Sequence, residues 1–163
     1  KREKPERASH VYALGSSMGA MGLVRAAAKD PRIEAVILDS CFASAPQWVH
    51  QHAARLPVLG RLFADLGLAA ASLHAGRSLW ELDAVEAVAE ISPRPVLLIH
   101  GREDWLIPPI NMAILFDAAR EPKDQWLGPG PHSNIMTTDF DGYQKRVIRF
   151  LKIASGLDSS RPD

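Results

Sequence analysis

The hydrophobic positions of this chain form short continuous runs that alternate with longer alanine-rich or amphipathic stretches. The short runs have the length of strands, at residues 10–14, 35–38, 95–100 and 125–127. Runs that are apolar throughout are typical of strands covered on both faces, as in a parallel sheet. The longer stretches predict helices at residues 18–28, 83–91, 109–120 and 138–154. This alternation predicts an α/β fold, with a mostly parallel sheet of about four strands flanked by helices.

One segment interrupts the alternation. Residues 44–82 contain no clear strand, are rich in alanine and leucine, and are divided by Pro46, Pro57 and Gly60. We expect two or three short helices here, as a cap-like insertion within a single domain spanning residues 1–163. Insertions of this kind often cover a site. The large apolar residues of the insertion would either line a pocket or form a small core of their own, and we favour the core. These residues are Trp48, Leu56, Leu59, Leu62, Phe63, Leu66 and Trp80.

Composition and charge exclude several classes of partner. The 163 residues are 47% hydrophobic and 23% charged, as in an ordinary globular domain. Lys and Arg together number 19, as do Asp and Glu. The chain has no excess of positive charge, so we expect that it does not bind nucleic acid. The longest apolar stretch, residues 66–73, is shorter than the roughly 20 residues of a membrane span. Cys41 is the single cysteine, and His50 and His52 do not share a helix face, so we expect no metal and no cofactor.

A candidate nucleophile lies between the first expected strand and the first expected helix. Residues 15–19 read Gly-Ser-Ser-Met-Gly and fit the pattern G-x-S-x-G. A serine in this context sits on a sharp strand-to-helix turn that exposes its hydroxyl. Because the turn brings two backbones together, we expect both Gly15 and Gly19 to be required. The pattern assigns the nucleophile to Ser17 and an oxyanion-binding N–H to Met18, at the positive end of the helix.

A serine nucleophile needs a base, and the base needs an orienting carboxylate. Two later loops supply these groups in the order serine, aspartate, histidine that accompanies this type of turn. Asp104 follows the strand at residues 95–100, at the edge where open parallel sheets build their sites. Residues 105–108, beginning with Trp105, would cover this carboxylate, with Glu103 facing solvent. His132 lies in a loop rich in glycine and proline, and Asp39, which also ends a strand, is the alternative partner of His132.

Together these motifs resemble the α/β-hydrolase family, in its esterase and serine-peptidase-like branch. The resemblance extends from His10 to Ala154, and it rests on residues 15–19, 38–40, 93–101, 104, 107–108 and 129–132. It implies the C-terminal half of an α/β-hydrolase fold, with Ser17, Asp104 and His132 as a catalytic triad. The implied activity is that of a serine hydrolase, which cleaves a carboxylic ester, a thioester or a peptide through an acyl-enzyme.

One departure from the family concerns the beginning of the sheet. In the family the nucleophile follows the fifth of eight strands, whereas here it is residue 17. We therefore expect a half-sheet that lacks the N-terminal strands and the loop with the second oxyanion donor. Its exposed first strand would pair with a missing N-terminal half or with a second copy in a homodimer. The alternative function is a non-catalytic or incomplete hydrolase fragment that acts as an assembly module. A dehalogenase would need a carboxylate where Ser17 stands.

Overall fold

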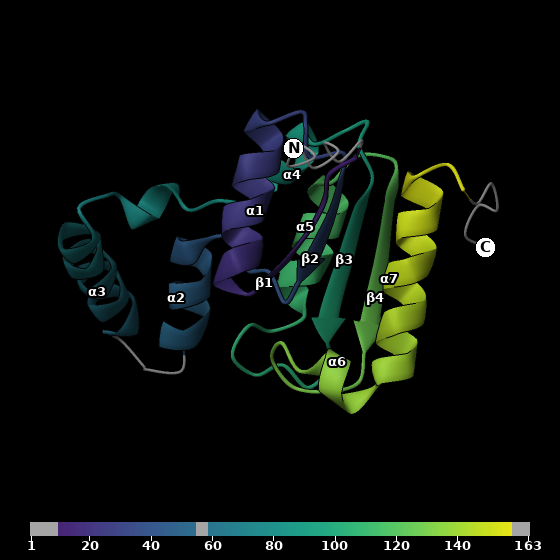
Figure 1. Ribbon diagram of the computed structural model, residues 1–163. Helices are drawn as coiled ribbons and strands as arrows, with labels where there is room; N and C mark the ends of the chain where they lie inside the picture. Colours follow the sequence, from purple (N-terminus) through teal and green to yellow (C-terminus); the bar gives the residue numbers. More distant parts are fainter. Residues whose placement is uncertain (1–9, 55–58, 158–163) are drawn as a thin grey trace, which may run out of the picture.

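A parallel sheet of four strands forms the centre of the protein (Figure 1). A computed structural model describes residues 10–54 and 59–157. The strands are β1 (Tyr12–Ser16), β2 (Ala35–Asp39), β3 (Val96–Gly101) and β4 (Lys123–Gly128). They lie side by side in the order β1-β2-β3-β4, and each neighbouring pair is parallel. The expected α/β fold is confirmed, and each strand begins and ends within two residues of its expected bounds.

Helices connect the strands and cover both faces of the sheet (Figure 1). They are α1 (Met18–Lys29), α2 (Ala45–Ala53), α3 (Gly60–Ala75), the 3₁₀ turn η1 (Leu79–Glu81), α4 (Val85–Glu90), α5 (Ile110–Ala118), α6 (Ile135–Thr138) and α7 (Phe140–Ala154). The helix expected at residues 138–154 begins later, because Asp139 leaves the helical conformation and caps α7 by accepting a bond from the Gly142 N–H. Within residues 10–54 and 59–157, no helix has the length and hydrophobicity that a membrane crossing requires.

The apolar runs of β2 and β3 are explained by burial on both sides. Successive side chains of a strand point to opposite faces of the sheet. One face packs against α1, α4 and α5 and is formed by Val36, Leu38, Val96 and Leu98. The other face packs against α6 and α7 and is formed by Ala35, Ile37, Leu97 and Ile99. None of these eight side chains is more than 2% exposed, so the two central strands anchor the sheet in two separate hydrophobic clusters.

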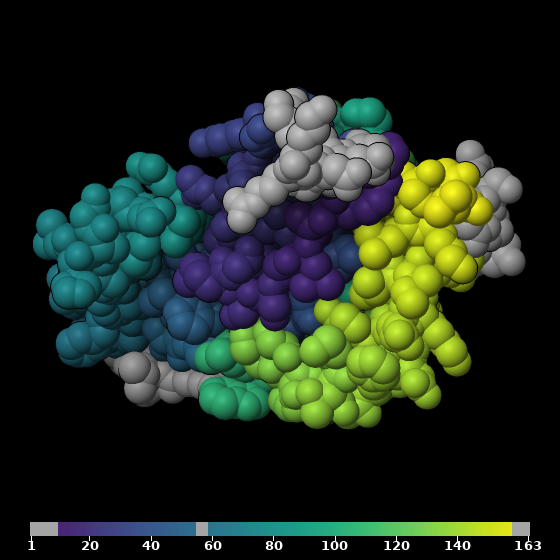
Figure 2. Space-filling view, viewed as in Figure 1, coloured from purple at the N-terminus to yellow at the C-terminus, as the bar shows by residue number. Residues whose placement is uncertain are grey.

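The two outer strands differ in what they present to solvent. Within the described residues, β1 pairs only with β2, and its Leu14 is 50% exposed. The early residues of the chain lie on the surface between α3 and α7 in Figure 2, where they are purple. By contrast, β4 begins with the polar residues Lys123, Asp124 and Gln125. Polar residues are common on a protected edge strand, whereas an exposed apolar edge favours pairing with a further strand.

The two longer helices of residues 44–82, α2 and α3, stand beside the sheet rather than on a face of it (Figure 1). A hydrogen bond of 2.7 Å between His50 and Asp65 joins them, and Ala64 and Leu68 of α3 are buried. The small core expected from the large apolar residues is wrong: five of them are between 43% and 60% exposed, namely Leu59, Leu62, Phe63, Leu66 and Trp80. A layer only one helix pair thick leaves the outer side of α3 uncovered. Leu56 lies outside the described residues.

Truncation of a central strand residue tests this description of the core. We expect Leu98→Ala to lower the free energy of unfolding by about 2–5 kcal/mol, because Leu98 is 1% exposed and its loss leaves a cavity. The matched control, Leu73→Ala, removes a side chain that is 84% exposed on α3 and should change stability by less than about 0.5 kcal/mol. Urea denaturation of both variants measures the difference, and equal effects would contradict the burial described here.

Candidate active site

Four candidate residues gather at one edge of the sheet because the strands are parallel. Ser17 follows β1, Asp39 ends β2, Asp104 follows β3, and His132 lies in the loop after β4. The carboxyl ends of parallel strands meet at the same edge. In Figure 1 this edge lies at the lower end of the sheet, where the arrowheads of β3 and β4 point towards α6. Residues separated by up to 115 positions along the chain are therefore neighbours here.

The turn between β1 and α1 holds Ser17 in a strained conformation. Its φ is 52° and its ψ is −121°, and its N–H donates to the Asp39 carbonyl over 2.9 Å. Non-glycine residues rarely adopt a positive φ, and such strain is concentrated at functional sites. A Cβ on Gly15 would lie 2.7 Å from the Gly19 carbonyl oxygen, so the turn requires glycine at position 15. The same expectation for Gly19 is wrong: among the described residues, a Cβ there meets nothing within 4 Å outside its own helix.

Ser17, His132 and Asp104 form a continuous chain of hydrogen bonds. The Ser17 Oγ lies 2.8 Å from the His132 Nε2, and the His132 Nδ1 lies 2.7 Å from the Asp104 Oδ2. A carboxylate accepts but does not donate, so the His132 Nδ1 carries the proton and its Nε2 remains an acceptor for the Ser17 hydroxyl. The geometry is that of a serine activated by an oriented imidazole.

The Asp104 side chain is fully buried and has partners for both of its oxygens. Its Oδ1 accepts from the N–H groups of Leu106 and Ile107, over 3.0 and 2.8 Å. Burial alone would raise the pKa of Asp104, but hydrogen bonds from His100, Ile107 and His132 outweigh it and leave the pKa below its usual value. Asp104 is therefore held as a carboxylate that faces His132.

His100 is a site residue that the sequence analysis did not identify. It is 1% exposed, and its Nε2 lies 2.7 Å from the Ile107 carbonyl oxygen and 3.3 Å from the Asp104 Oδ2. One N–H thus holds both ends of the turn that carries the carboxylate. A histidine that ends an otherwise apolar strand was the available signal, because a buried polar side chain needs a partner.

Asp39, the alternative partner of His132, makes different contacts. Its carboxylate is hydrogen-bonded to Ser40 and Tyr143. Of the two carboxylates considered from the sequence, Asp104 is the one bonded to the His132 ring.

The loops that carry Asp104 and His132 touch backbone to backbone. A Cβ on Gly101 would lie 2.3 Å from the carbonyl oxygen of Gly130, in the histidine loop. Glu103 is exposed, as expected, but it also accepts a hydrogen bond from the Gly130 N–H and so ties the two loops together. Residues 105–108 cover the carboxylate as expected, through the Leu106 and Ile107 N–H groups, but the Trp105 indole is 67% exposed and takes no part in this cover.

An apolar cavity of about 310 Å³ opens beside Ser17. Its walls come from the turn before α1, the segment after β2, the cap-like insertion and the aspartate loop, with Met18, Phe42, Trp48, Leu82 and Ile107 among the lining residues. The Trp48 Nε1 donates to the Leu106 carbonyl over 2.8 Å, which fastens α2 to the aspartate loop. Trp48 thus lines a pocket instead of forming part of a separate core. Met18 begins α1, so its N–H has no acceptor inside the helix and lies next to the Ser17 hydroxyl in sequence.

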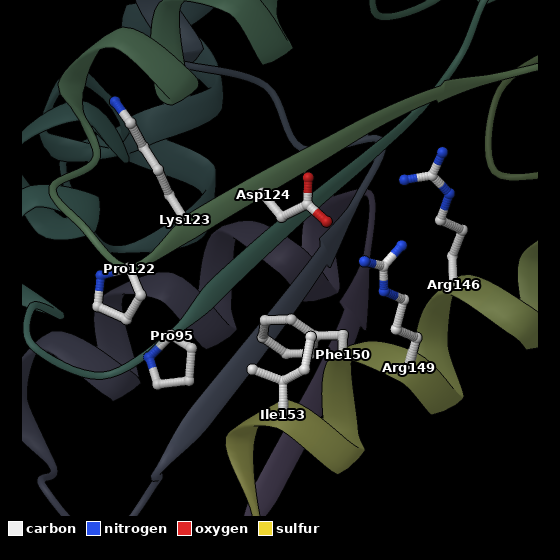
Figure 3. Close-up of a pocket in the computed structure, with 8 residues that line it drawn as sticks. All are labelled: Pro95, Pro122, Lys123, Asp124, Arg146, Arg149, Phe150 and Ile153. Carbon is white, nitrogen blue, oxygen red and sulfur yellow. The ribbon is translucent and has the colours of Figure 1, made fainter. Parts of the chain in front are cut away.

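A second, smaller cavity lies at the opposite edge of the sheet (Figure 3). It measures about 80 Å³, between the first residues of β4 and the last turns of α7. Arg146 and Arg149 extend from α7 on the side of Asp124, above Phe150 (Figure 3). Its volume suits only a few water molecules, and it shares no residue with the cavity beside Ser17.

Other groups offer no competing chemistry in the part of the chain that the structure describes. No cluster of three or more histidine, cysteine, aspartate or glutamate side chains there is arranged to hold a metal ion. Cys41 is buried, and burial raises the pKa of its thiol to about 12. A thiol with this pKa is not a nucleophile at neutral pH.

Comparison with curated proteins finds relatives that are about twice as long. No protein-family model matches the sequence. The uncharacterized protein YfhR of Escherichia coli K12 is 30% identical over 142 residues, which are 85% of this chain and 44% of YfhR. The α/β-hydrolase domain-containing protein WAV2 of Arabidopsis thaliana is 28% identical over 151 residues, covering 88% of this chain and 47% of WAV2. The chain therefore spans about half the length of the curated relatives that it matches.

Comparison with solved structures finds the same fold in esterases. The Pyrococcus furiosus esterase Pf2001 superimposes with a TM-score of 0.68 at 20% identity, over 94% of this chain and 56% of that one. The esterase domain of a Rhodothermus marinus protein superimposes with a TM-score of 0.59 at 24% identity, over 86% of this chain and 59% of that one. At these identities the similarity shows the fold of the chain.

The contact between the two loops is testable by adding one methyl group. We expect Gly101→Ala to destabilise the protein by about 1–3 kcal/mol, because the new Cβ collides with the backbone of the histidine loop. Hydrogen exchange should also accelerate at the Arg102 and Glu103 amides, which bond to Gly128 and Gly130. The matched control is Gly67→Ala on α3, where a Cβ meets nothing within 4 Å outside its own helix. Unchanged exchange in Gly101→Ala would contradict the proposed collision.

Proposed function

We propose that this chain, which by its fold belongs to the α/β-hydrolase superfamily, carries the reacting groups of a serine hydrolase. The observation that supports this function best is the hydrogen-bonded chain of Ser17, His132 and Asp104 at the mouth of an apolar cavity. A serine, an imidazole and a buried carboxylate in this order can form and hydrolyse an acyl-enzyme without a cofactor.

In the proposed first step, the Ser17 oxygen attacks the carbonyl carbon of an ester. The His132 Nε2 takes the hydroxyl proton as the new carbon–oxygen bond forms. The imidazole becomes positively charged, and the carboxylate of Asp104 stabilises it through the Nδ1–H. The negative oxygen of the tetrahedral intermediate accepts a hydrogen bond from the Met18 N–H, at the positive end of α1. His132 then gives its proton to the departing alcohol, which leaves the acyl group on Ser17.

In the second step, water replaces the alcohol. His132 takes a proton from the water molecule, whose oxygen attacks the acyl carbon. The tetrahedral intermediate collapses, the proton returns to the Ser17 oxygen, and a carboxylic acid leaves. Both steps use the same base and the same N–H donor, so one arrangement of side chains serves acylation and deacylation.

The lining of the cavity favours an ester or thioester with an apolar acyl group. No charged side chain lines it within the described residues. Its volume of about 310 Å³ lies at the lower end of the range for small-molecule sites, roughly 300–1,000 Å³. We infer that the acyl chain of medium length enters between the cap-like insertion and the aspartate loop, while the alcohol remains outside. A peptide would have to place a polar backbone in this apolar space.

The exposed edge of β1 supports a second function, that of an assembly module. Leu14 is half exposed on a strand with one neighbour among the described residues. We propose that this edge pairs with a further strand, either from another part of a longer protein or from a second copy. The two functions are compatible if pairing completes the active site. If the assembled protein hydrolyses no ester, only the assembly function remains.

The role of Ser17 is tested by its removal from the full-length protein. We expect the protein to react with a fluorophosphonate probe and to hydrolyse p-nitrophenyl butyrate, both through Ser17. Ser17→Ala should abolish labelling and lower kcat by at least about 10³-fold, because no other residue can carry the acyl group.

The control is Ser155→Ala, which replaces a serine at the end of α7, outside the cavity. It should retain labelling and turnover. A full-length protein that is folded but reacts with neither reagent would refute the serine hydrolase and leave the assembly module.

The acyl cavity is tested by filling it. We expect Val49→Trp to lower kcat/KM for p-nitrophenyl octanoate at least about 10-fold more than for p-nitrophenyl acetate, because the indole occupies space that only the longer chain needs. Acetate turnover serves as the internal control for folding and for the reacting groups. An equal loss for both esters would place the acyl chain elsewhere.

A further inference from the structure

A second network of hydrogen bonds reaches His132 through the residue that follows it in the sequence. It begins at Ser133, the next residue, whose φ is 52°. The Ser133 N–H donates to the Ser40 Oγ over 3.1 Å, and its Oγ accepts from the Ser16 hydroxyl over 2.9 Å. Ser16, the last residue of β1, and Ser40, the residue after β2, thus hold the residue that follows the proposed base.

Ser40 connects this backbone to a buried carboxylate. Its hydroxyl donates to the Asp39 Oδ1 over 2.9 Å, and the Tyr143 hydroxyl from α7 donates to the Asp39 Oδ2 over 3.0 Å. Ser40 and Asp39 are 0% and 4% exposed. Because a hydroxyl has one proton, Ser40 accepts from Ser133 while donating only to Asp39. Both Asp39 oxygens therefore lie within hydrogen-bonding distance of a hydroxyl.

The backbone around this network is strained in two places. Ser40 and Ser133 both have a φ of 52°, although neither is a glycine. Such conformations persist only where surrounding interactions hold them. The Ser40 N–H donates to the Ile99 carbonyl over 2.8 Å, and the Ser40 side chain holds the Ser133 N–H. Loss of the hydroxyl would therefore free the histidine loop at the residue beside the base.

We propose that Asp39, Ser40 and Ser133 form a second carboxylate arm, which positions His132 through its own backbone and adds a negative charge near its ring. This inference rests on the proposed function of Ser17 and His132. Asp39 and Ser40 are positioning residues, because their contacts reach the base only through Ser133. The arm gives Asp39 a role beside that of Asp104, rather than in place of it.

Among the described residues, few titratable groups lie near Asp39 and His132. His132 bonds to Asp104 from the loop after β3, and Asp39 lies at the end of β2. The nearby titratable groups are His100 on β3, which bonds to Asp104, and Tyr143 on α7, which bonds to Asp39. An added negative charge favours the imidazolium form of His132. Neutralising Asp39 should therefore move the pH dependence of the reaction to lower pH.

The substitution Asp39→Asn in the full-length protein tests the arm. The amide oxygen can still accept from Ser40, but the charge is lost. Burial raises the pKa of Asp39, partly offset by its bonds to Ser40 and Tyr143, so an uncharged isostere removes a desolvation cost and should fold. We expect kcat for p-nitrophenyl butyrate to fall about 10- to 100-fold while KM changes less than about threefold. The ascending limb of the pH profile of kcat/KM should move to lower pH by roughly 0.5–1 unit.

A second variant separates position from charge. Ser40→Ala keeps the Asp39 carboxylate and removes the hydrogen bond to the Ser133 N–H, so we expect the same loss of kcat with no shift in the pKa of His132. The matched control is Asp124→Asn at the start of β4, which removes a carboxylate outside this network and should change neither quantity.

Titration of the His132 ring by NMR gives a readout that does not depend on turnover. A lower pKa in Asp39→Asn, with wild-type values in Ser40→Ala and Asp124→Asn, supports the arm. Wild-type kcat and pKa in Asp39→Asn overturn it. If Asp39→Asn unfolds, the kcat of Ser40→Ala decides, and a wild-type value overturns the arm. A wild-type protein that reacts with no ester refutes the proposed function instead, and the NMR titration then tests the arm alone.

Discussion

The buried carboxylate of Asp104 organises the loops that follow β3 and β4 at the carboxyl edge of the sheet. A charge without exposure to water must be matched by hydrogen bonds or ionic partners. Here the partners come from three segments: His100 lies near the end of β3, the Ile107 N–H belongs to the turn after it, and His132 lies in the loop after β4. Satisfying one carboxylate therefore fixes the distance between two loops. The same requirement sets the tautomer of His132 and aims its second nitrogen at Ser17.

Strain in the backbone is concentrated around this carboxylate. The three non-glycine residues with a positive φ in the described chain are Ser17, Ser40 and Ser133, and all three lie at the same edge of the sheet. Each is held by a bond to a neighbouring strand end or loop, so that the sheet, buried on both faces, bears the cost. Local strain of this kind favours one arrangement of the side chains over many looser ones.

The cap-like insertion and the first strand are both connected to the candidate site. Trp48 joins the insertion to the aspartate loop, so the wall of the apolar cavity and the orientation of Asp104 depend on each other. On the other side, β1 leads into the turn that holds Ser17 while leaving Leu14 half exposed. Any strand that pairs with β1 would therefore stiffen the segment that holds Ser17. The site is thus linked to the edge that we propose for assembly.

The order of elements and the candidate residues that meet at the carboxyl edge of the sheet could be predicted from local sequence patterns. Continuous apolar runs predicted the parallel strands, because burial on both faces leaves no polar period, and the glycine at position 15 marked a turn that no larger residue fits. The choice between Asp39 and Asp104, the role of His100 and the link from Ser40 to Ser133 were decided only in the tertiary structure. These contacts depend on loop closure between residues 28 to 93 positions apart, or on which way a buried strand-end side chain turns. The exposure of α3 was likewise undecidable from its composition, because an apolar helix face is buried only when a second layer covers it.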